Sequence, residues 1–297
     1  MSSSGIRGRS RVIGITLGDG AGIGPEVIDA ALASGELDAA FEYRVFGKRG
    51  AVAGAPTPET ARDAIAALEE AVRLALAGEL AAIVTGPISK ALVQREGFAF
   101  PGQTEFFAAR TGTRNFAMCL TGGALTVALV TAHVPLRDVP ALLSAPEIVR
   151  VGGLLAEFVA RRCGRRPRIA VAGLNPHAGE SGALGREEIE MIEPATLLLN
   201  GEFGEIADFT GPLSPDTVFH RAVAGEFDGV LCMYHDQGLI PLKLHAFESG
   251  VNVTLGLPFP RTSPDHGTAF DLAGRGLARP DSMIAAIRLA TELTGFA

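Results

Sequence analysis

Short runs of apolar residues alternate along the chain with longer segments in which apolar positions recur at helical spacing. The short runs are predicted strands and lie at 12–16, 81–85, 125–131, 169–173, 228–233 and 251–255. The longer segments are predicted helices and lie at 27–33, 57–78, 147–162 and 186–199. Strands that alternate with helices favour a mostly parallel sheet with right-handed crossovers and helices on its faces. The pattern therefore predicts an α/β protein.

Local signals mark both ends of the helix predicted at 57–78. Thr57 is a predicted N-cap, Pro58 suits the first helical position, and Gly78 is a predicted stop. The first strand is followed by a glycine-rich loop, 18–26, which lacks the dinucleotide fingerprint GxGxxG because Ile23 occupies the third glycine position. We therefore expect a tight packing turn there rather than a nucleotide-phosphate loop.

Composition and charge exclude several classes of protein. With 297 residues, 47% hydrophobic and 20% charged, the chain has the composition of an ordinary soluble enzyme. A formal net charge of −7 without any basic tract gives little support to nucleic-acid binding. Cys119, Cys163 and Cys232 are odd in number and widely spaced, so we expect free thiols and a cytoplasmic location. No apolar run reaches the ~18 residues of a membrane span, and we expect neither export nor membrane association.

Three histidines follow predicted strands. His133 comes after the run 125–131, His177 after 169–173, and His235 after 228–233. Because the carboxyl ends of parallel strands lie at one edge of a sheet, we expect the three imidazoles to face the same crevice. Three neutral imidazoles with an open fourth position are the ligand set of catalytic zinc, although nearby carboxylates would also admit other divalent ions.

Two further side chains close to His235 are candidates for proton transfer. Asp236 and Lys243 follow the same predicted strand, and either could move the proton of a substrate hydroxyl polarised by a bound cation. Lys243 is equally suited to anchor a phosphate or carboxylate. By contrast, Lys90 is expected to be solvated, and Thr104 with its neighbouring Glu105 is explained as helix capping when taken alone.

Six motifs together resemble one enzyme family over nearly the whole chain. They are GPISK at 86–90, GQTEF at 102–106, TAHVPL at 131–136, GLNPHAGE at 173–180, MYHDQG at 233–238 and DHGTA at 265–269. In order and combination they resemble the 4-hydroxythreonine-4-phosphate dehydrogenases. The stretches 18–27 and 266–276 are also similar to isopropylmalate and isocitrate dehydrogenases, which implies their two-lobed α/β/α fold with an active-site cleft between the lobes.

The resemblance implies that the two lobes have different roles. It predicts a discontinuous, cofactor-associated outer lobe at 1–130 plus 255–297, and a central lobe at 131–254 that carries the metal site and the dimer contacts. It also implies a homodimer with a shared active site. The family's metal ligands fall on His133, His177 and His235, with zinc the expected ion and Mg or Co as alternatives.

The resemblance also implies the remaining site residues and the reaction. Substrate-binding positions fall on Gln103, Thr104, Lys243, Asn252 and Arg261, and the cofactor loop falls on His266, Gly267, Thr268 and Asp271. The family oxidises a secondary alcohol with NAD, after which the resulting β-keto acid loses CO2, in pyridoxine biosynthesis. An acid at position 271 would bind the ribose 2′-hydroxyl and repel a 2′-phosphate, which favours NAD over NADP.

Two departures from the family pattern leave the substrate open. Gln103 stands where the family usually has histidine, and Gly20 replaces the usual proline of the first loop. The substrate is therefore 4-hydroxythreonine 4-phosphate, a related four-carbon acid phosphate such as threonate or erythronate 4-phosphate, or an unphosphorylated hydroxy acid. The rival functions are a metal-dependent hydrolase and a phosphate acyltransferase, and a non-catalytic binding protein is the weakest alternative.

Overall fold

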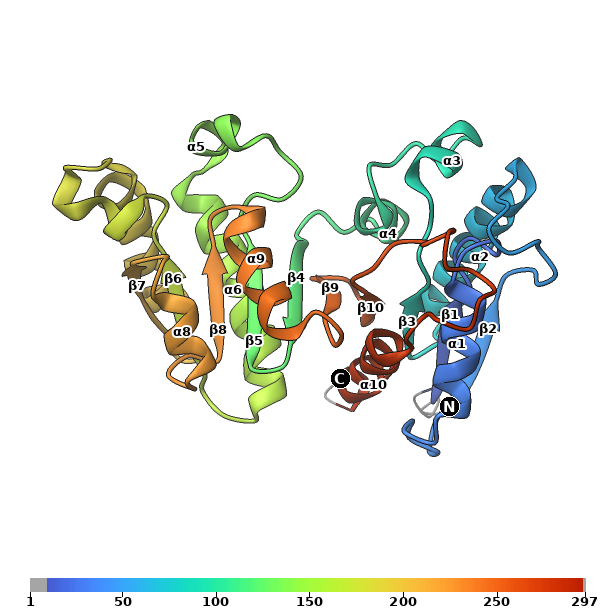
Figure 1. Cartoon of the computed structure of the whole chain (residues 1–297). Helices are drawn as coiled ribbons and strands as arrows, with labels where there is room; N and C mark the ends of the chain where they lie inside the picture. Colours follow the sequence, from blue (N-terminus) through green and yellow to red (C-terminus); the bar gives the residue numbers. More distant parts are fainter. Residues whose placement is uncertain (1–9, 296–297) are drawn as a thin grey trace. The chain divides into compact units, whose positions relative to one another are not determined.

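The computed structural model describes residues 10–295. The chain divides into two compact units, which Figure 1 shows with colours that follow the sequence. Unit 1 comprises residues 10–112 and 258–295, and unit 2 comprises residues 113–257. Each unit has its own layer of strands between helices, as expected for an α/β protein.

Unit 1 is built on four parallel strands in the order β2 (Glu42–Phe46), β1 (Val12–Thr16), β3 (Ala82–Thr85) and β10 (Arg261–Pro264). Its helices are α1 (Gly24–Ala33), α2 (Pro58–Leu76), α3 (Lys90–Arg95), α4 (Gln103–Thr111) and α10 (Asp281–Thr294). Helices α1 and α10 lie together, and α2 packs on β1 and β3 (Figure 1). Burial of Ile13 and Ile83 in the strands and Leu68 in α2 forms the core of this unit.

Unit 2 has six strands, in the order β9 (Val251–Leu255), β4 (Ala117–Gly122), β5 (Leu125–Leu129), β8 (Gly229–Cys232), β6 (Arg168–Ala172) and β7 (Asp208–Leu213). Strand β4 runs antiparallel to β5 and β9, and the other pairs are parallel. Its helical segments are η1 (Leu136–Asp138), α5 (Val139–Leu142), α6 (Ala145–Cys163), η2 (Pro176–Gly182), η3 (Glu188–Ile192), α7 (Glu193–Phe203), α8 (Val218–Val223) and α9 (His235–Ala246).

The two faces of the unit 2 sheet are covered by different helices. Val230 and Cys232 point toward α8 and α9, where they pack with Leu239 and Leu242. Leu231, between them in the strand, faces α6 and α7: a Cβ added to Gly152 of α6 would lie 3.2 Å from Leu231 Cδ2 and 2.7 Å from Cδ2 of Leu199 in α7. Side chains that alternate along a strand are buried on both faces, which explains the continuous apolar run in the sequence.

Several local predictions are confirmed. Strands β1 and β9 have the predicted ends, and Thr57 caps α2 by accepting a hydrogen bond from Thr60 N. The glycine loop is a close-packed turn: Gly18 has φ 72°, and a Cβ added there would lie 2.1 Å from Pro87 O. A Cβ on Gly24 would lie 2.0 Å from Leu17 O, so no larger residue fits either position without movement of the backbone.

Other details differ from the sequence analysis. The sequence analysis predicted no strand at Arg261, but this residue begins β10 and pairs with Ile83 of β3. The predicted helix 186–199 is a π-helical turn followed by α7. The elements that were not predicted include β2, β4, β7 and the 14-residue helix α10. The structure also divides the chain at 112/113 and 257/258 rather than at 130/131 and 254/255, because β4 and β5 pair with β9 and β8.

The cysteines are free thiols, as predicted: Cys119 and Cys232 are buried and Cys163 is exposed. Burial raises the pKa of Cys119 to about 12, so this thiol stays protonated and packs as an apolar side chain. Among residues 10–295, no single helix is long and apolar enough to cross a membrane. The segments Leu136–Leu142 and Ala145–Cys163 pass such a test only as a pair, across a bend of 97°.

Candidate active site

Two of the three predicted imidazoles lie together in unit 2. The ring centroids of His133 and His235 are 5.5 Å apart, and the ring planes are inclined by 44°. They meet because the chain continues in parallel beyond β5 and β8: Thr131 donates to Met233 O through its backbone N–H at 3.2 Å and its hydroxyl at 2.8 Å. Neighbouring parallel strands thus deliver both histidines to one place, as the sequence predicted.

A carboxylate fixes the ring of His235. Nδ1 of His235 lies 2.7 Å from Oδ1 of Asp236, in the first turn of α9. A hydrogen bond from Nδ1–H to a carboxylate leaves Nε2 with the lone pair, which is the form that binds a cation. Lys243 lies on the same helix, roughly 12 Å along its axis from His235 at 1.5 Å per residue.

A buried glutamine holds the start of α9 in place. Gln237 is 6% exposed, accepts a hydrogen bond from Met233 N at 2.7 Å and donates one to Gly173 O at 2.7 Å. It therefore ties the exit of β8 to the exit of β6, the strand that leads to His177. The sequence analysis quoted Gln237 within a motif but gave it no role.

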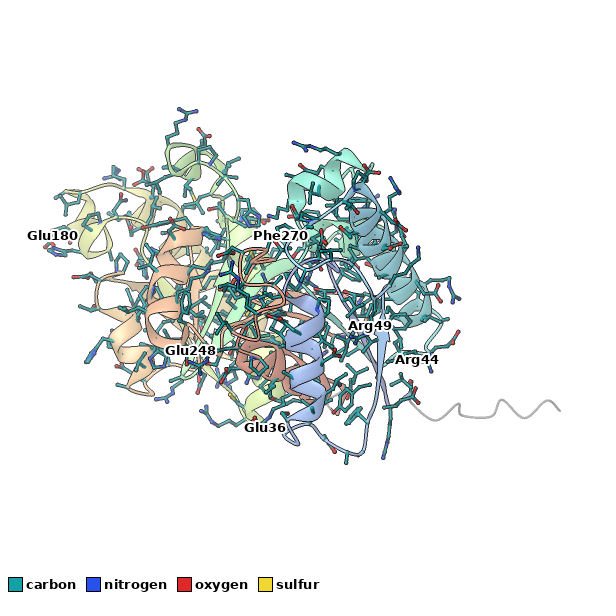
Figure 2. The ribbon with its side chains drawn as sticks, turned by 45° about the vertical axis from the view of Figure 1, so that its right-hand side comes forward. Glu36, Arg44, Arg49, Glu180, Glu248 and Phe270 are labelled. Carbon is teal, nitrogen blue, oxygen red and sulfur yellow. The ribbon has the colours of Figure 1, made fainter. Side chains whose placement is uncertain are left out.

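His177 lies in a backbone conformation that is rare for residues other than glycine. The run from His177 to Ser181 has positive φ throughout, with φ 52° at His177 and 44° at Glu180. Each non-glycine residue in this region costs roughly 1–3 kcal/mol, so neighbouring structure must hold the turn. Figure 2 labels Glu180 at the outer edge of unit 2, and its Oε2 lies 3.1 Å from Nδ1 of His177.

The anchor of this turn is Glu188, which is 2% exposed. Its Oε1 accepts hydrogen bonds from Leu174 N at 2.8 Å and Asn175 N at 2.7 Å, and its Oε2 accepts one from Asn175 Nδ2 at 3.0 Å. A Cβ on Gly179 would lie 2.6 Å from the same Oε2, so the carboxylate fills the space beneath the turn.

The sequence analysis missed Glu188, although the chain contains a signal for it. Glu188, Ile192, Ala195 and Leu199 follow helical spacing and are all buried, so one acid stands among apolar residues on a core-facing surface. A carboxylate in such a position must have buried hydrogen-bond partners.

A single chain does not assemble the three histidines. Within residues 10–295, no three His, Cys, Asp or Glu side chains gather as a metal-binding group. His177 has acidic neighbours of its own: the pKa of Asp216 is held low, first by the hydroxyl of Ser214 and to a smaller extent by His177. The sequence analysis predicted that all three imidazoles face one crevice. Within one chain, only His133 and His235 lie together, and His177 is separate from them.

A second polar cluster lies in unit 1. The Nη2 atom of Arg261 donates to Thr85 Oγ1 at 2.5 Å and to Gln103 Oε1 at 2.9 Å. Arg261 is 3% exposed, and its burial lowers the pKa of the guanidinium to about 10 while Glu105 opposes the shift. Arg261 is therefore still a cation at neutral pH, held next to the N-terminus of α4.

The capping interpretation of this helix start is wrong. Gly102 is the N-cap of α4, and it has no side chain with which to cap. Thr104 and Glu105 lie in the first turn rather than at the N-cap, and Oε2 of Glu105 is buried with no hydrogen-bond partner among the described residues.

The predicted cofactor loop lies between β10 and α10 in unit 1. Thr268 O accepts a hydrogen bond from Ile23 N at 2.9 Å, so the loop rests on the glycine-rich turn that precedes α1. Nδ1 of His266 lies 3.2 Å from Gly267 O, and Asp271 is exposed in the turn that follows. The four predicted residues are therefore close in space as well as in sequence.

Some buried polar atoms have no partner among residues 10–295. They include Oδ1 of Asn252 and Nε2 of His266, which the sequence analysis assigned to substrate and cofactor, and Oδ2 of Asp19, which it missed. Buried polar atoms are almost always hydrogen-bonded in folded proteins, so such atoms mark places where a ligand can complete the bonding.

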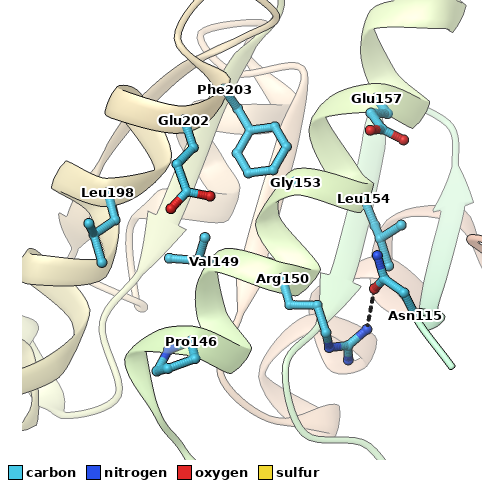
Figure 3. Close-up of a pocket in the computed structure, with 10 residues that line it drawn as sticks. All are labelled: Asn115, Pro146, Val149, Arg150, Gly153, Leu154, Glu157, Leu198, Glu202 and Phe203. Carbon is cyan, nitrogen blue, oxygen red and sulfur yellow. Dashed lines mark hydrogen bonds between the residues drawn. The ribbon is translucent and has the colours of Figure 1, made fainter.

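A pocket of about 430 Å³ lies away from these groups, between α6 and α7 (Figure 3). Leu154 and Phe203 contribute apolar surface, and Arg150 at its rim donates to Asn115 Oδ1 at 2.9 Å. None of the predicted site residues lines it.

Several solved structures with this fold are dehydrogenases. The crystal structure of 4-hydroxythreonine-4-phosphate dehydrogenase from Klebsiella pneumoniae has a TM-score of 0.80 and 38% identity, covering 96% of this chain and 100% of that chain. A β-decarboxylating dehydrogenase from Thermococcus kodakarensis, with a TM-score of 0.52 and 18% identity over 94% of this chain and 81% of its own, shares the fold. The chain is an oxidoreductase of this α/β class.

Sequence comparison defines the family. The family described as "Pyridoxal phosphate biosynthetic protein PdxA" matches residues 27–290. The 4-hydroxythreonine-4-phosphate dehydrogenase of Desulfosudis oleivorans is 45% identical over 324 residues, which is 95% of each protein. The chain therefore belongs to the PdxA family, and both the resemblance and the fold class expected from the sequence are confirmed. A branched-chain phosphotransacylase from Enterococcus faecalis shares the fold at 14% identity and a TM-score of 0.56, over 95% of this chain and 99% of its own, but family membership favours a dehydrogenase over the acyltransferase and hydrolase alternatives.

Proposed function

We propose that this chain oxidises the secondary hydroxyl of 4-hydroxythreonine 4-phosphate, or of a closely related four-carbon hydroxy-acid phosphate, with NAD as the hydride acceptor. Loss of CO2 from the resulting β-keto acid completes the reaction. The observation that carries the proposal is the similarity to a dehydrogenase of this name across 95% of the chain. The role in pyridoxal phosphate synthesis follows from the family description.

The histidines suit a divalent metal ion, for which zinc is the proposed identity. In His235 and His177 a carboxylate occupies Nδ1, and this carboxylate–histidine arrangement is the one that directs Nε2 toward a metal. His133 would supply the third imidazole. When bound, the ion would act as a Lewis acid on the substrate oxygen. Asp236 and Lys243 are the groups proposed to move the proton.

The separation of His177 from the other two histidines supports a shared site in a homodimer. A second copy can supply the ligand that one chain does not bring to the pair. Helix α9, which begins at His235, also has an apolar row that lacks a cover in one chain: Ile240 is 65% exposed, Leu244 89% and Phe247 77%. Their spacing places them on one side of the helix, as expected for a surface that packs against another subunit.

The remaining groups would bind the substrate and the cofactor. Arg261 and Lys243 are cations suited to phosphate and carboxylate, and Asn252 offers its unpaired Oδ1. Thr104 lies in the first turn of α4, and Gln103 beside it would contribute through its hydrogen bond with Arg261. For NAD, the proposed residues are His266, Gly267, Thr268 and Asp271.

The test is a set of four-carbon acid phosphates, with unphosphorylated hydroxy acids as controls, assayed by the absorbance of NADH. We expect NADH to form with at least one phosphorylated acid, CO2 to be released in equal amount, and a chelator to abolish both. Turnover that is unchanged after complete removal of metal contradicts the metal site. If no hydroxy acid gives NADH, the proposed reaction is wrong. The cytoplasmic location stays a prediction, based on the three thiols.

A further inference from the structure

Gln103 holds the buried Arg261 of unit 1, and both the nitrogen and the oxygen of its side-chain amide make hydrogen bonds. Nε2 of Gln103 donates to Gly86 O at 3.1 Å, and Oε1 of Gln103 accepts from Nη2 of Arg261 at 2.9 Å. A carbonyl oxygen only accepts and a guanidinium only donates, so these two partners allow one orientation of the amide. Gln103 therefore bridges the exit of β3 and the start of β10.

Other contacts complete the fixation of the guanidinium. Thr85, 1% exposed, accepts from the same Nη2, so both N–H groups of that nitrogen have acceptors. The ring of Phe107 lies beneath the guanidinium, with its centroid 5.5 Å from the Cζ atom. Phe107 follows Gln103 by four residues, so one face of α4 supplies both the hydrogen bond and the aromatic surface.

We propose that Gln103 is a positioning residue: it fixes the Arg261 guanidinium for the anionic group of the substrate and does not itself recognise that group. This inference rests on the substrate-binding role proposed above for Arg261. Both N–H groups of Nη2 are bonded within unit 1, so a phosphate or carboxylate would bind at the remaining N–H groups of the guanidinium. Their direction is set by the plane in which Gln103 and Thr85 hold the guanidinium. An uncharged amide at position 103 provides this orientation without adding a charge beside Arg261.

Two variants change the amide in different ways. Gln103→Met keeps the length of the side chain but removes both hydrogen bonds. Gln103→Glu keeps an acceptor for Arg261, but it places a carboxylate oxygen next to Gly86 O, where neither atom can donate a hydrogen bond. The new negative charge also neutralises much of the guanidinium charge. Gln94→Glu is the matched control, because Gln94 is an exposed glutamine of the same unit that makes one long hydrogen bond to Phe100 O.

The measurement is the dissociation constant of inorganic phosphate, determined by calorimetry, together with KM and kcat for the phosphorylated substrate. Gln103→Met loses a hydrogen bond to a charged group. We therefore expect its phosphate dissociation constant and its KM each to rise about tenfold, while its kcat stays within about twofold of the parent value. Gln103→Glu should weaken phosphate binding at least as much. The thermal midpoint confirms that each variant is folded, and Gln94→Glu should bind as the parent chain does.

A double-mutant cycle with Arg261→Lys separates positioning from direct contact. If Gln103 acts through Arg261, Gln103→Met has little further effect in the Arg261→Lys background; if Gln103 contacts the anion itself, the two effects add. Additive effects, or a phosphate constant within twofold of the parent for both Gln103 variants, overturn the inference. Unchanged phosphate binding in Arg261→Met refutes the role of Arg261, and with it this inference. A chain that binds phosphate as expected but forms no NADH contradicts the reaction alone.

Discussion

Nδ1 of His235 and Oδ1 of Asp236, neighbours in the chain, lie 2.7 Å apart at the first turn of α9. The same relationship recurs between His177 and Glu180, at 3.1 Å. In both pairs a carboxylate that is more than half exposed occupies Nδ1. The two imidazoles therefore present the same nitrogen, Nε2, although they lie in different helical segments of unit 2, α9 and η2.

Replacing His235 should abolish metal binding. We expect His235→Ala to bind no stoichiometric divalent ion and to lose turnover, while its circular dichroism and thermal midpoint stay close to those of the parent. Asp236→Ala should weaken metal binding by about tenfold, because the ring loses its orienting partner. Metal content and calorimetric titration measure both effects. His220→Ala, an exposed histidine in α8, is the control and should keep its metal.

The turn that carries His177 depends on a buried carboxylate. Glu188→Gln removes the charge that strengthens the hydrogen bonds from Leu174 N and Asn175 N, and it places an NH2 group opposite Nδ2 of Asn175. It should lower the free energy of unfolding by roughly 1–3 kcal/mol. Chemical denaturation measures this loss, and hydrogen exchange should become faster at those two amides. The exposed Glu193→Gln should change neither quantity. Equal stability of the two variants would show that Glu188 does not hold the turn.

The apolar row of α9 should be a subunit contact. A charge placed at its centre by Leu244→Glu together with Ile240→Glu should convert the dimer to a monomer, as measured by light scattering after size exclusion. Metal binding should weaken in the same variant, because the shared ligand set is lost. Leu197→Glu alters another exposed leucine, 69% exposed on α7, and should stay dimeric. A parent chain that is monomeric at micromolar concentration would refute the shared site.

Stability should depend on pH through Asp228, at the start of β8. Desolvation tends to raise the pKa of Asp228, but Arg165 and the N–H of Arg168 outweigh it and hold that pKa below its ordinary value. The ionised carboxylate therefore stabilises the fold fully above its unfolded pKa of about 4, and this contribution is lost as the pH falls through the lower folded value. Asp228→Asn should cost roughly 1–2 kcal/mol at pH 7.

The difference between Asp228→Asn and the parent should shrink as the pH is lowered below about 4. Urea denaturation at several pH values measures it. Asp208→Asn is the comparison, since Asp208 is half exposed in its ion pair with Arg166 and should cost less. A difference that stays constant down to acid pH would show that ionisation of Asp228 does not contribute.

Cofactor preference should follow the acid at position 271. We expect faster turnover with NAD than with NADP at equal concentration, and a smaller difference in Asp271→Asn, because the amide no longer repels a 2′-phosphate. Initial rates with both cofactors measure the effect. Comparable rates in the parent chain would argue against this role of Asp271.

The elements that could be predicted were those in which one local signal was sufficient. Thr57 and Pro58 marked the start of α2, and continuous apolar runs located β5, β6 and β8. Strand β10 was missed because Arg261, Thr262 and Ser263 are polar, yet all are buried there. A polar strand is stabilised by partners on distant segments, such as Ile83 of β3, and these partners leave no periodic pattern in the sequence.

The sequence by itself determined the α/β class, the family and the residue types of the site, because apolar periodicity and short motifs are local properties of the chain. Only the tertiary structure decided which of these residues meet. It brought His133 to His235 through the pairing of β5 with β8, left His177 on its own left-handed turn over Glu188, and joined Gln103 to Arg261 across 158 positions. The physical reason is that such contacts depend on strand order and burial, which bring distant segments together and are not encoded in the spacing of residues along the chain.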